Sequence, residues 1–284
     1  MKTIVELSKA KREMIKSKIS LLPRRPNLVI LSTGSDEASK VYVKAKEKAC
    51  EEVGIKCVTC KIDEDTTTQE LIEIIDKLNG SSKADGIIVQ LPLPGHIDES
   101  AVLSSINIVK DVDGLNPFNL GSIGIKDPLI DLSACTPKGI MSILDYYDVP
   151  LRGAHAVVIG TSKIVGKPMM LELIKADATV TVCNSKTKNL PSLTKLADIL
   201  IVAVGKPKMV RADWVKDGAT VIDVGINRLE GRKLCGDVDY DEVKKVAKVI
   251  TPVPKGVGLM TVTSLLENVY TAYTMQMEPL KGVH

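Results

Sequence analysis

The chain has 284 residues, of which 44% are hydrophobic and 26% are charged, a balance typical of globular proteins that bury a core. At roughly 100 to 200 residues per domain, this length predicts two domains. The 38 basic and 35 acidic residues leave a net charge of +3 and are mixed along the helical stretches, so the charge pattern gives no reason to expect nucleic acid. We therefore expect small molecules as ligands.

The sequence contains no apolar run of membrane-spanning length, and its first residues lack the apolar segment of a signal peptide. Its six cysteines are irregularly spaced. Only Cys57 and Cys60 have the spacing of a redox or metal motif, but they lie in a predicted strand and have no second pair. We expect a cytoplasmic protein with reduced cysteines, no membrane contact and no bound metal.

Short β-branched runs alternate with amphipathic stretches, which predicts an α/β fold with mostly parallel sheets. The expected elements of the first half are strands over residues 27–33, 56–62 and 86–91 and helices over residues 39–53, 68–78 and 98–106. Each helix begins near a serine, threonine or aspartate that can cap it. Together they predict one βαβαβ unit.

A second set of elements begins after Gly153. Its expected strands cover residues 154–160, 179–183, 199–205, 220–225 and 249–253. These runs are continuously apolar, as in a parallel sheet that helices cover on both faces. A linking helix, residues 140–147 with Pro137 in its first turn, precedes the set, and a final helix over residues 260–277 is expected to return to the first domain.

The segment from Gly160 to Gly166 directly follows a predicted strand and precedes a predicted helix. Such a turn presents backbone N–H groups and a helix N-terminus, which together bind a pyrophosphate. Because Ser162 replaces the second glycine of the usual dinucleotide motif, an ordinary turn that needs glycine is the alternative. The next strand is followed by Asn184, Ser185 and Lys186, without the acid that binds the ribose of NAD, so NADP is favoured over NAD.

Tyr42 and Lys46 lie one turn apart on one face of the first predicted helix, with Lys44 and Lys48 nearby. A partly buried lysine among other cations can exchange protons near neutral pH, whereas an exposed lysine-rich face is the alternative. Short-chain dehydrogenases share the Tyr-x-x-x-Lys spacing, but there it follows the glycine-rich turn, and here it precedes that turn.

Two further polar positions follow strand-like runs. Gln90 lies at the expected carboxyl end of the third strand, where its amide could bind a substrate or a lysine. The turn-rich stretch from Lys110 to Gly114 holds carboxylates that could accept two hydrogen bonds from a cyclic amidine-like edge. For each position, a helix cap or a turn residue is the alternative.

Seven motifs resemble, in this order, those of the bifunctional methylenetetrahydrofolate dehydrogenase/methenyltetrahydrofolate cyclohydrolase family. They are Tyr42-x-x-x-Lys46, Val89-Gln90-Leu91-Pro92-Leu93-Pro94, Lys110-Asp111-Val112-Asp113-Gly114, Cys135-Thr136-Pro137-x-Gly139, Gly160-x-Ser162-x-Ile164-Val165-Gly166-x-Pro168, Asp223-Val224-Gly225-Ile226-Asn227 and Thr251-Pro252-Val253-Pro254-x-Gly256-Val257-Gly258. The resemblance covers nearly the whole chain.

This resemblance implies an N-terminal α/β catalytic, folate-binding domain of residues 1–134 and 259–284, and a Rossmann-type, parallel-sheet NADP-binding domain of residues 135–258. It implies oxidation of 5,10-methylenetetrahydrofolate with NADP, hydrolysis of the methenyl product to 10-formyltetrahydrofolate, and a homodimer. Lys46 is the implied catalytic lysine, held by Gln90, with Tyr42 against the folate and Asp113 on its pterin ring. The other implied folate contacts are Val89, Leu91, Pro254, Lys255, Gly256, Val257 and Gly258, and the implied cofactor contacts are Gly160, Thr161, Ser162, Ser185 and Ile226.

Three positions depart from the family pattern. Thr161 stands where many relatives have an arginine that can pair with the 2′-phosphate, and Lys255 and Leu259 replace a glycine and a proline. Thr161 makes a cyclohydrolase without effective hydride transfer one alternative. A non-catalytic NADP-binding sensor is another, but the joint presence of the implied catalytic residues disfavours it.

Overall fold

The computed structural model describes residues 2–33, 37–125, 131–229 and 234–277. The chain divides into two compact units. The N-terminal unit comprises Lys9–Cys135 and the chain from Val262 onward, and the central unit comprises Thr136–Thr261 and the residues up to Ser8. The end of the last helix therefore belongs to the N-terminal unit, as the sequence predicts.

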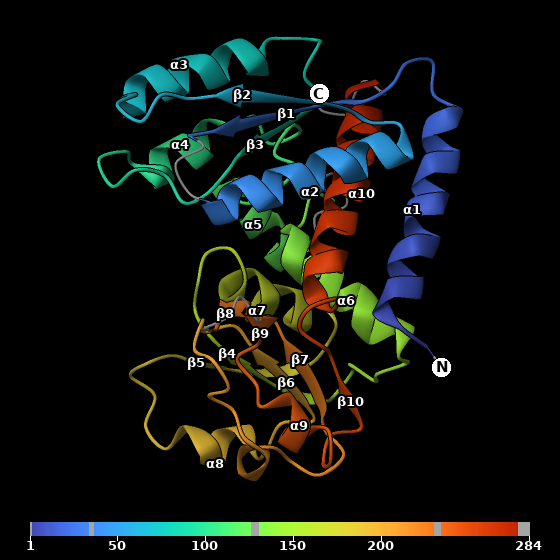
Figure 1. Cartoon of the computed structure of the whole chain (residues 1–284), viewed down its shortest axis with the longest axis vertical. Helices are drawn as coiled ribbons and strands as arrows, with labels where there is room; N and C mark the ends of the chain where they lie inside the picture. The colour runs from blue at the N-terminus through green and yellow to red at the C-terminus, as the bar shows by residue number, and fades with distance from the viewer. Residues whose placement is uncertain (1, 34–36, 126–130, 230–233, 278–284) are drawn as a thin grey trace. The chain divides into compact units, whose positions relative to one another are not determined.

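A three-stranded parallel sheet forms the centre of the N-terminal unit. Its strands are β1 (Asn27–Ser32), β2 (Lys56–Lys61) and β3 (Gly86–Val89), in the order β2-β1-β3 (Figure 1). Alternate residues of β1 face opposite sides, since Leu28 and Ile30 belong to one core cluster and Val29 and Leu31 to another. The first cluster contains side chains of α2 (Glu37–Val53) and α10 (Val257–Met277), and the second those of α3 (Thr68–Asn79) and α4 (Glu99–Ser105). Helices thus cover both faces of the sheet.

The caps of α3 and α4 confirm the predicted helix starts. Thr67 and Glu70 form a capping box at α3, in which the Thr67 hydroxyl accepts from the Glu70 N–H and the Glu70 carboxylate accepts from the Thr67 N–H. Asp98 caps α4 by accepting from the N–H groups of Ser100 and Ala101. The Asp98 N–H donates to Thr68 Oγ1 at 2.9 Å, so the starts of the two helices lie together.

The central unit contains a five-stranded parallel sheet in the order β10-β7-β6-β4-β5 (Figure 1). Its strands are β4 (His155–Ile159), β5 (Thr179–Cys183), β6 (Ile199–Val202), β7 (Thr220–Asp223) and β10 (Val249–Ile250). Because the strand order reverses beside β4, a crevice is expected at the carboxyl ends of β4 and β6, where open α/β sheets bind their ligands.

Helices cover both faces of this second sheet as well. The helices α6 (Cys135–Tyr146) and α7 (Gly166–Lys175) pack against one face, and α8 (Leu190–Thr194) and α9 (Tyr240–Val243) pack against the other. A 3-10 turn (Ala212–Trp214) and an antiparallel pair, β8 (Asn227–Arg228) and β9 (Leu234–Cys235), complete the unit. Within the described residues, no helix has the length and apolar character needed to cross a membrane.

Two helices of the structure, α1 (Ile4–Ser20) and α5 (Pro117–Ile125), have no counterpart in the sequence prediction. The helix α1 contributes Ile4 and Leu7 to the core of the central unit and Ile15 and Ile19 to that of the N-terminal unit. Asn116 directly precedes α5, and its Oδ1 accepts from the Phe118 N–H at 2.8 Å. This helix follows directly from the Lys110–Gly114 stretch.

Candidate active site and cofactor site

Lys46 and Gln90 form a hydrogen bond in the N-terminal unit. Lys46 lies on α2, Gln90 directly follows β3, and Lys46 Nζ donates to Gln90 Oε1 at 3.1 Å. The Gln90 N–H donates to Leu31 O at 2.8 Å, and its Nε2 donates to Leu91 O at 2.8 Å. Because the side-chain nitrogen is used in this way, the amide oxygen faces the lysine. The structure therefore brings these two predicted residues together.

The neighbouring residues of α2 show how Lys46 differs from the other lysines of this helix. Lys44 and Lys48 are exposed, whereas Lys46 is half-buried, so the lysine-rich stretch is not one uniform solvated face. Tyr42 lies one turn before Lys46 and is 40% exposed. Partial burial raises the pKa of the Tyr42 phenol, so the hydroxyl is neutral near pH 7 and the ring can pack against a ligand.

Two charged residues of the Lys110–Gly114 stretch are structural. Lys110 Nζ donates to the carbonyls of Leu78 and Ser81, at 3.0 and 2.8 Å, at the end of α3, and burial lowers the pKa of Lys110. The Asp111 carboxylate accepts from the Asn116 N–H at 2.8 Å and from Asn119 Nδ2 at 2.9 Å, which fixes the start of α5. Burial raises the pKa of Asp111 to about 6.

Asp113 has a different environment. It is half-buried, and its carboxylate forms no hydrogen bond or ion pair with the other described residues. Its backbone is held firmly, since Asp113 O accepts from the Cys135 N–H and a Cβ on the next residue, Gly114, would lie 2.4 Å from Ala134 N. A parallel bridge pairs Ile87 with Asp111, so Asp113 lies at the same sheet edge as Gln90. Asp113 is thus the carboxylate of this stretch that is free to bind a ligand.

The implied folate contacts beside Gln90 differ in accessibility. Val89 is 2% exposed within the core, and Leu91 packs partly buried against the same cluster. Val89 can therefore offer a ligand only its backbone. The strand was predicted over residues 86–91 but ends at Val89, because the residues after Val89 leave the sheet toward Pro92 and Pro94.

The implied folate loop from Pro254 to Gly258 lies in the central unit. Pro254 and Lys255 are exposed, and Lys255 has the left-handed φ of 71° that favours glycine. The next residue, Gly256, is tightly enclosed, since a Cβ there would lie 2.1 Å from Pro252 O. Val257 and Gly258 were expected in the loop, but they form the first turn of α10, and Val257 is 5% exposed in the core. The loop is therefore shorter than predicted.

The Gly160–Gly166 turn has the close backbone packing of a dinucleotide-binding turn. Gly160 has a φ of 122°, and a Cβ there would lie 2.2 Å from Ala203 O, after β6. A Cβ on Gly166 would lie 2.0 Å from Gly160 O. Ser162 Oγ accepts from the N–H groups of Val165 and Gly166, at 3.1 and 3.4 Å, where α7 begins. Thr161 and Ser162 are exposed, so this helix start is open to an anionic group.

The loop after β5 lies next to this turn, because the Gly160 N–H donates to Cys183 O at 2.9 Å. The loop is shaped by Asn184, whose N–H donates to Thr187 Oγ1 at 2.9 Å and whose Oδ1 accepts from the Lys186 N–H at 2.8 Å. Ser185 and Lys186 are exposed, and neither side chain bonds to another described residue. A hydroxyl and an ammonium group are thus available on the loop for which the sequence predicts contact with a 2′-phosphate.

Three buried polar residues that support these loops were not found from the sequence. Asn268 on α10 is fully buried, and its Nδ2 donates to Val112 O and Ser133 O, both at 2.9 Å, which holds the segment that carries Asp113. Asp223 and Asp237 lie beside Ile226, which is 48% exposed. The available signals were an asparagine within an apolar helix and an aspartate at the end of an apolar strand.

The Cys57-x-x-Cys60 spacing does not form a joint site. Cys57 packs against the core cluster that contains α2, and Cys60 packs against the cluster that contains α3, so the two thiols face opposite sides of β2. All six cysteines are free thiols. Among the residues that the structure describes, no group of three or more histidine, cysteine, aspartate or glutamate side chains could hold a metal ion.

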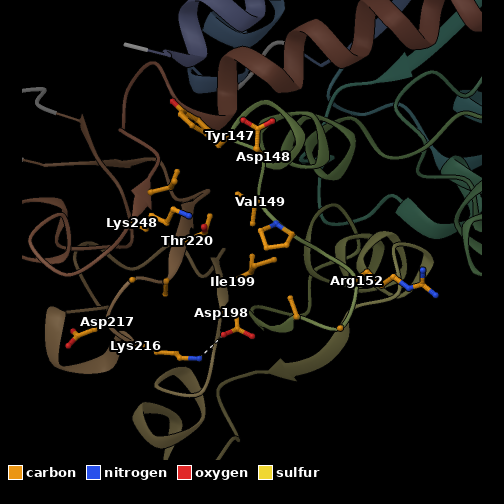
Figure 2. A pocket seen from close by; sticks show the side chains of 16 residues that line it. Tyr147, Asp148, Val149, Arg152, Asp198, Ile199, Lys216, Asp217, Thr220 and Lys248 are labelled. Carbon is orange, nitrogen blue, oxygen red and sulfur yellow. Dashed lines mark hydrogen bonds and ion pairs between the residues drawn. The ribbon is translucent and has the colours of Figure 1, made fainter.

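A cavity of about 510 Å³ lies at the amino ends of β4, β6, β7 and β10 (Figure 2). The predicted site residues do not line it. The ion pair between Lys216 Nζ and Asp198 Oδ1, at 2.6 Å, neutralises part of its wall. Because ligands of open α/β sheets bind at the carboxyl ends of the strands, this cavity is not a candidate active site.

Comparisons with known proteins show which family this chain is similar to. The catalytic-domain model of the "Tetrahydrofolate dehydrogenase/cyclohydrolase" family matches residues 4–113, and its NAD(P)-binding-domain model matches residues 134–277. The "Bifunctional protein FolD" of Bacillus mycoides is 50% identical over 267 residues, which are 93% of this chain and 92% of that protein.

Two solved structures are similar along nearly the whole chain. The bifunctional enzyme FolD, a methylenetetrahydrofolate dehydrogenase/cyclohydrolase from Campylobacter jejuni, is 45% identical with a TM-score of 0.91, covering 95% of this chain and 96% of that one. The N5,N10-methylenetetrahydrofolate dehydrogenase-cyclohydrolase of Trypanosoma brucei, solved with NADP and an inhibitor, is 36% identical with a TM-score of 0.91, covering 96% of each chain.

Proposed function

The chain belongs to the tetrahydrofolate dehydrogenase/cyclohydrolase family, and we propose that Lys46, oriented by Gln90, transfers the protons in the hydrolytic reaction of its bifunctional chemistry. The enzyme oxidises 5,10-methylenetetrahydrofolate to the 5,10-methenyl compound and hydrolyses that product to 10-formyltetrahydrofolate. The observation that carries the proposal is the 3.1 Å bond between Lys46 Nζ and Gln90 Oε1, at the sheet edge that also holds the free carboxylate of Asp113.

Asp113 is the residue proposed to hold the pterin ring. The ring presents neighbouring N–H groups, and a carboxylate without protein partners can accept two hydrogen bonds from them. Tyr42 supplies a flat, half-exposed ring on the same helix face as Lys46, against which the folate can stack. The substrate is thereby fixed in register with the lysine.

The oxidative step needs alignment more than a base. A hydride leaves the one-carbon bridge, and the resulting cation is stabilised by the two nitrogens that flank the carbon. Bound NADP supplies the hydride acceptor. The residues of this chain hold the reacting groups, so Lys46 is not required to take a proton in this step.

The hydrolytic step depends on proton transfer. Water attacks the methenyl carbon, and the proton that this water loses passes to Lys46. The bond from the carbon to N5 then breaks. N5 takes the proton held by Lys46, the hydroxyl oxygen releases its own proton to solvent water, and the carbon remains on N10 as a formyl group. Gln90 keeps the Lys46 nitrogen at the reacting carbon throughout.

The carboxyl edge of the central sheet fits NADP. The close approach at Gly160 and the open start of α7 suit a pyrophosphate, which carries negative charge and needs backbone N–H donors. Ser185 and Lys186 suit the 2′-phosphate, and the loop after β5 lacks the acid that would repel it. Ile226 is exposed after β7 and is proposed to contact the nicotinamide half. Thr161 adds no charge to the phosphate site.

The family also suggests assembly and location. We propose a homodimer in the cytoplasm that acts on tetrahydrofolate derivatives, with the N-terminal unit as the folate-binding catalytic domain and the central unit as the NADP-binding domain. Light scattering of the purified protein tests this assembly. A homodimer predicts a solution mass equal to that of two chains.

A single assay of the purified enzyme tests the two activities separately. Methylenetetrahydrofolate is mixed with NADP or NAD, and the absorbance of the reduced cofactor and of the methenyl compound are followed independently. The proposal predicts reduced cofactor with NADP in preference to NAD, followed by decay of the methenyl compound. Hydrolysis of separately added methenyl compound without cofactor reduction from the methylene compound would instead identify a cyclohydrolase, and binding of NADP without either reaction would identify a sensor.

A further inference from the structure

Asp223 and Asp237 are two buried carboxylates at the carboxyl edge of the central sheet, 3% and 0% exposed. Asp223 is the last residue of β7, and Asp237 follows the short strand β9. Neither has a role in the chemistry described above. Buried carboxylates persist when hydrogen bonds satisfy their oxygens, so their partners indicate what they hold.

The Asp223 carboxylate joins the end of β7 to the segment after β9. Its Oδ1 accepts from the Gly225 N–H at 3.0 Å and from the Asp237 N–H at 2.9 Å, and its Oδ2 accepts from the Val238 N–H at 3.0 Å. The Asp223 N–H in turn donates to Thr251 Oγ1 at 2.8 Å, after β10. Through its carboxylate and its backbone N–H together, Asp223 thus ties the ends of β7 and β10 to the segment after β9.

The Asp237 carboxylate joins the loops after β6 and β7. Its Oδ2 accepts from the N–H groups of Val204 and Gly205, at 2.7 and 2.9 Å, and its Oδ1 accepts from Asn227 Nδ2 at 2.8 Å. The loop after β6 begins with Ala203, whose carbonyl lies against Gly160 of the proposed pyrophosphate turn. Asp237 therefore connects the cofactor loops on both sides of β6.

Two glycines make room for this arrangement. A Cβ on Gly225 would lie 2.2 Å from the Asp237 Cγ, and a Cβ on Gly236 would lie 1.8 Å from the Asp223 Oδ2. Each glycine thus allows the neighbouring backbone to approach a carboxylate directly. The segments are packed so closely that a displaced carboxylate must move the loop it holds.

Ile226 lies between two residues that are hydrogen-bonded to these carboxylates. The residue before it, Gly225, is bonded to Asp223, and the residue after it, Asn227, is bonded to Asp237. Ser185 and Lys186 place the 2′-phosphate at the end of β5, on one side of the β4–β6 crevice. The loops after β6 and β7 therefore face the other half of the dinucleotide, which is the nicotinamide half.

We propose that Asp223 and Asp237 are positioning residues that hold Ile226 and the loops after β6 and β7 where the nicotinamide must lie for hydride transfer. The inference rests on the proposed NADP site. The proposal predicts different effects on the two reactions, since hydrolysis at Lys46 uses no cofactor. The carboxylates serve the dehydrogenase reaction and leave the cyclohydrolase reaction unaffected.

The test uses the Asn227→Ala and Asp223→Asn variants of the full-length enzyme, with Asp198→Asn as the control. Asn227→Ala removes one donor at a half-buried position and retains both buried carboxylates, and Asp198 lies at the opposite end of the same sheet. Misplacement of the nicotinamide should lower the dehydrogenase kcat by about 10- to 100-fold, because hydride transfer is sensitive to about 1 Å of displacement. The deuterium isotope effect on kcat should rise. Cyclohydrolase activity should stay within about twofold of the parent, since its proton transfer at Lys46 is untouched.

A binding measurement distinguishes misplacement of the nicotinamide from a general loosening of the central unit. The fragment 2′-phospho-ADP-ribose lacks the nicotinamide and should bind each folded variant as tightly as it binds the parent. Weaker fragment binding in step with lost activity, equal loss of both reactions, or unchanged dehydrogenase kinetics would each overturn the proposal. If Asp223→Asn does not fold, Asn227→Ala decides alone. If the parent itself reduces no NADP, the proposed function has failed and the positioning proposal fails with it.

Discussion

Gln90 orients Lys46 through an amide that is itself held in place. Its Oε1 lies 3.1 Å from Lys46 Nζ, while its Nε2 donates to Leu91 O and its backbone N–H donates to Leu31 O. The side chain can therefore present only its oxygen to the lysine. An amide oxygen accepts from an ammonium group without taking its proton, so the contact orients Lys46 and leaves its proton exchange to the substrate and water.

Gln90→Ala should lower the cyclohydrolase kcat by about 10- to 100-fold, because the lysine loses the partner that aims it at the reacting carbon. The affinity for NADP should not change, since Gln90 lies in the N-terminal unit and the proposed cofactor residues lie in the central unit. Steady-state hydrolysis of the methenyl compound measures the effect. Full cyclohydrolase activity in a folded Gln90→Ala protein would show that the contact has no catalytic role.

Asp113→Asn should raise the KM for the folate and lower kcat, since an amide cannot accept two hydrogen bonds from the ring edge in the same way. Loss of one charge-assisted pair should cost about 1.5 to 3 kcal/mol of transition-state stabilisation. The exposed Asp65 of the same unit supplies the control variant Asp65→Asn. Parent-like kinetics with a lower free energy of unfolding would instead make Asp113 a turn residue.

Asp111 should make the stability depend on pH in a defined direction. Burial raises its pKa from 3.8 to about 6, so between these pH values the folded protein keeps a proton that the unfolded chain loses. The free energy of unfolding contributed by Asp111 therefore falls as pH rises through this range. Asp111→Asn removes the titration, so the substitution should destabilise less at pH 7 than at pH 4, by about 2 kcal/mol. Urea unfolding of the parent and the variant at both pH values measures this difference. An equal loss of unfolding free energy at pH 4 and pH 7 would contradict the prediction.

Ser185→Asp should weaken NADP binding by about tenfold or more and change NAD binding little, because a carboxylate would face the 2′-phosphate. Thr161→Arg should act in the opposite direction by adding a bidentate partner for the same phosphate. Calorimetric titration of both cofactors into the parent and the two variants measures the preference. Equal affinities of the parent for NADP and NAD, with no difference between the variants, would exclude this loop as the phosphate site.

The strands of the two parallel sheets were predictable because each lies in a run of apolar or β-branched residues between turn or helix signals. The strand β5 has the predicted limits, and β1 and β2 end one residue early. The helix α1 escaped prediction because its apolar residues serve two cores, so they form no single stripe: Ile4 and Leu7 belong to one cluster, and Ile15 and Ile19 to another. The helix α5 contains proline and two glycines, which local propensity assigns to a turn.

The site residues also differ in whether the sequence could predict their contacts. The pairing of Lys46 with Gln90 could be expected, because the family resemblance implies it and the predicted strand end gives Gln90 an amide that could bind a lysine. The buried pair Asp223 and Asp237 could not, since their partners are backbone N–H groups at strand ends that the sequence does not bring together. The exposure of Asp113 and the burial of Asp111 were likewise indistinguishable in sequence, because both are aspartates of one turn and only tertiary contacts separate them.

The most direct test of the central claim compares Lys46→Met with Lys48→Met on the same helix. Lys46 is half-buried and bonded to Gln90, whereas Lys48 is exposed, so the pair controls for loss of a charge and for helix stability. The measured quantity is the rate of methenyltetrahydrofolate hydrolysis by each purified variant. Lys46→Met should lose hydrolysis by at least about a hundredfold, as expected when a general acid–base group is removed, and should still bind NADP. Lys48→Met should retain parent activity. Hydrolysis by Lys46→Met within a few-fold of the parent would contradict the assignment of Lys46 as the proton-transferring residue.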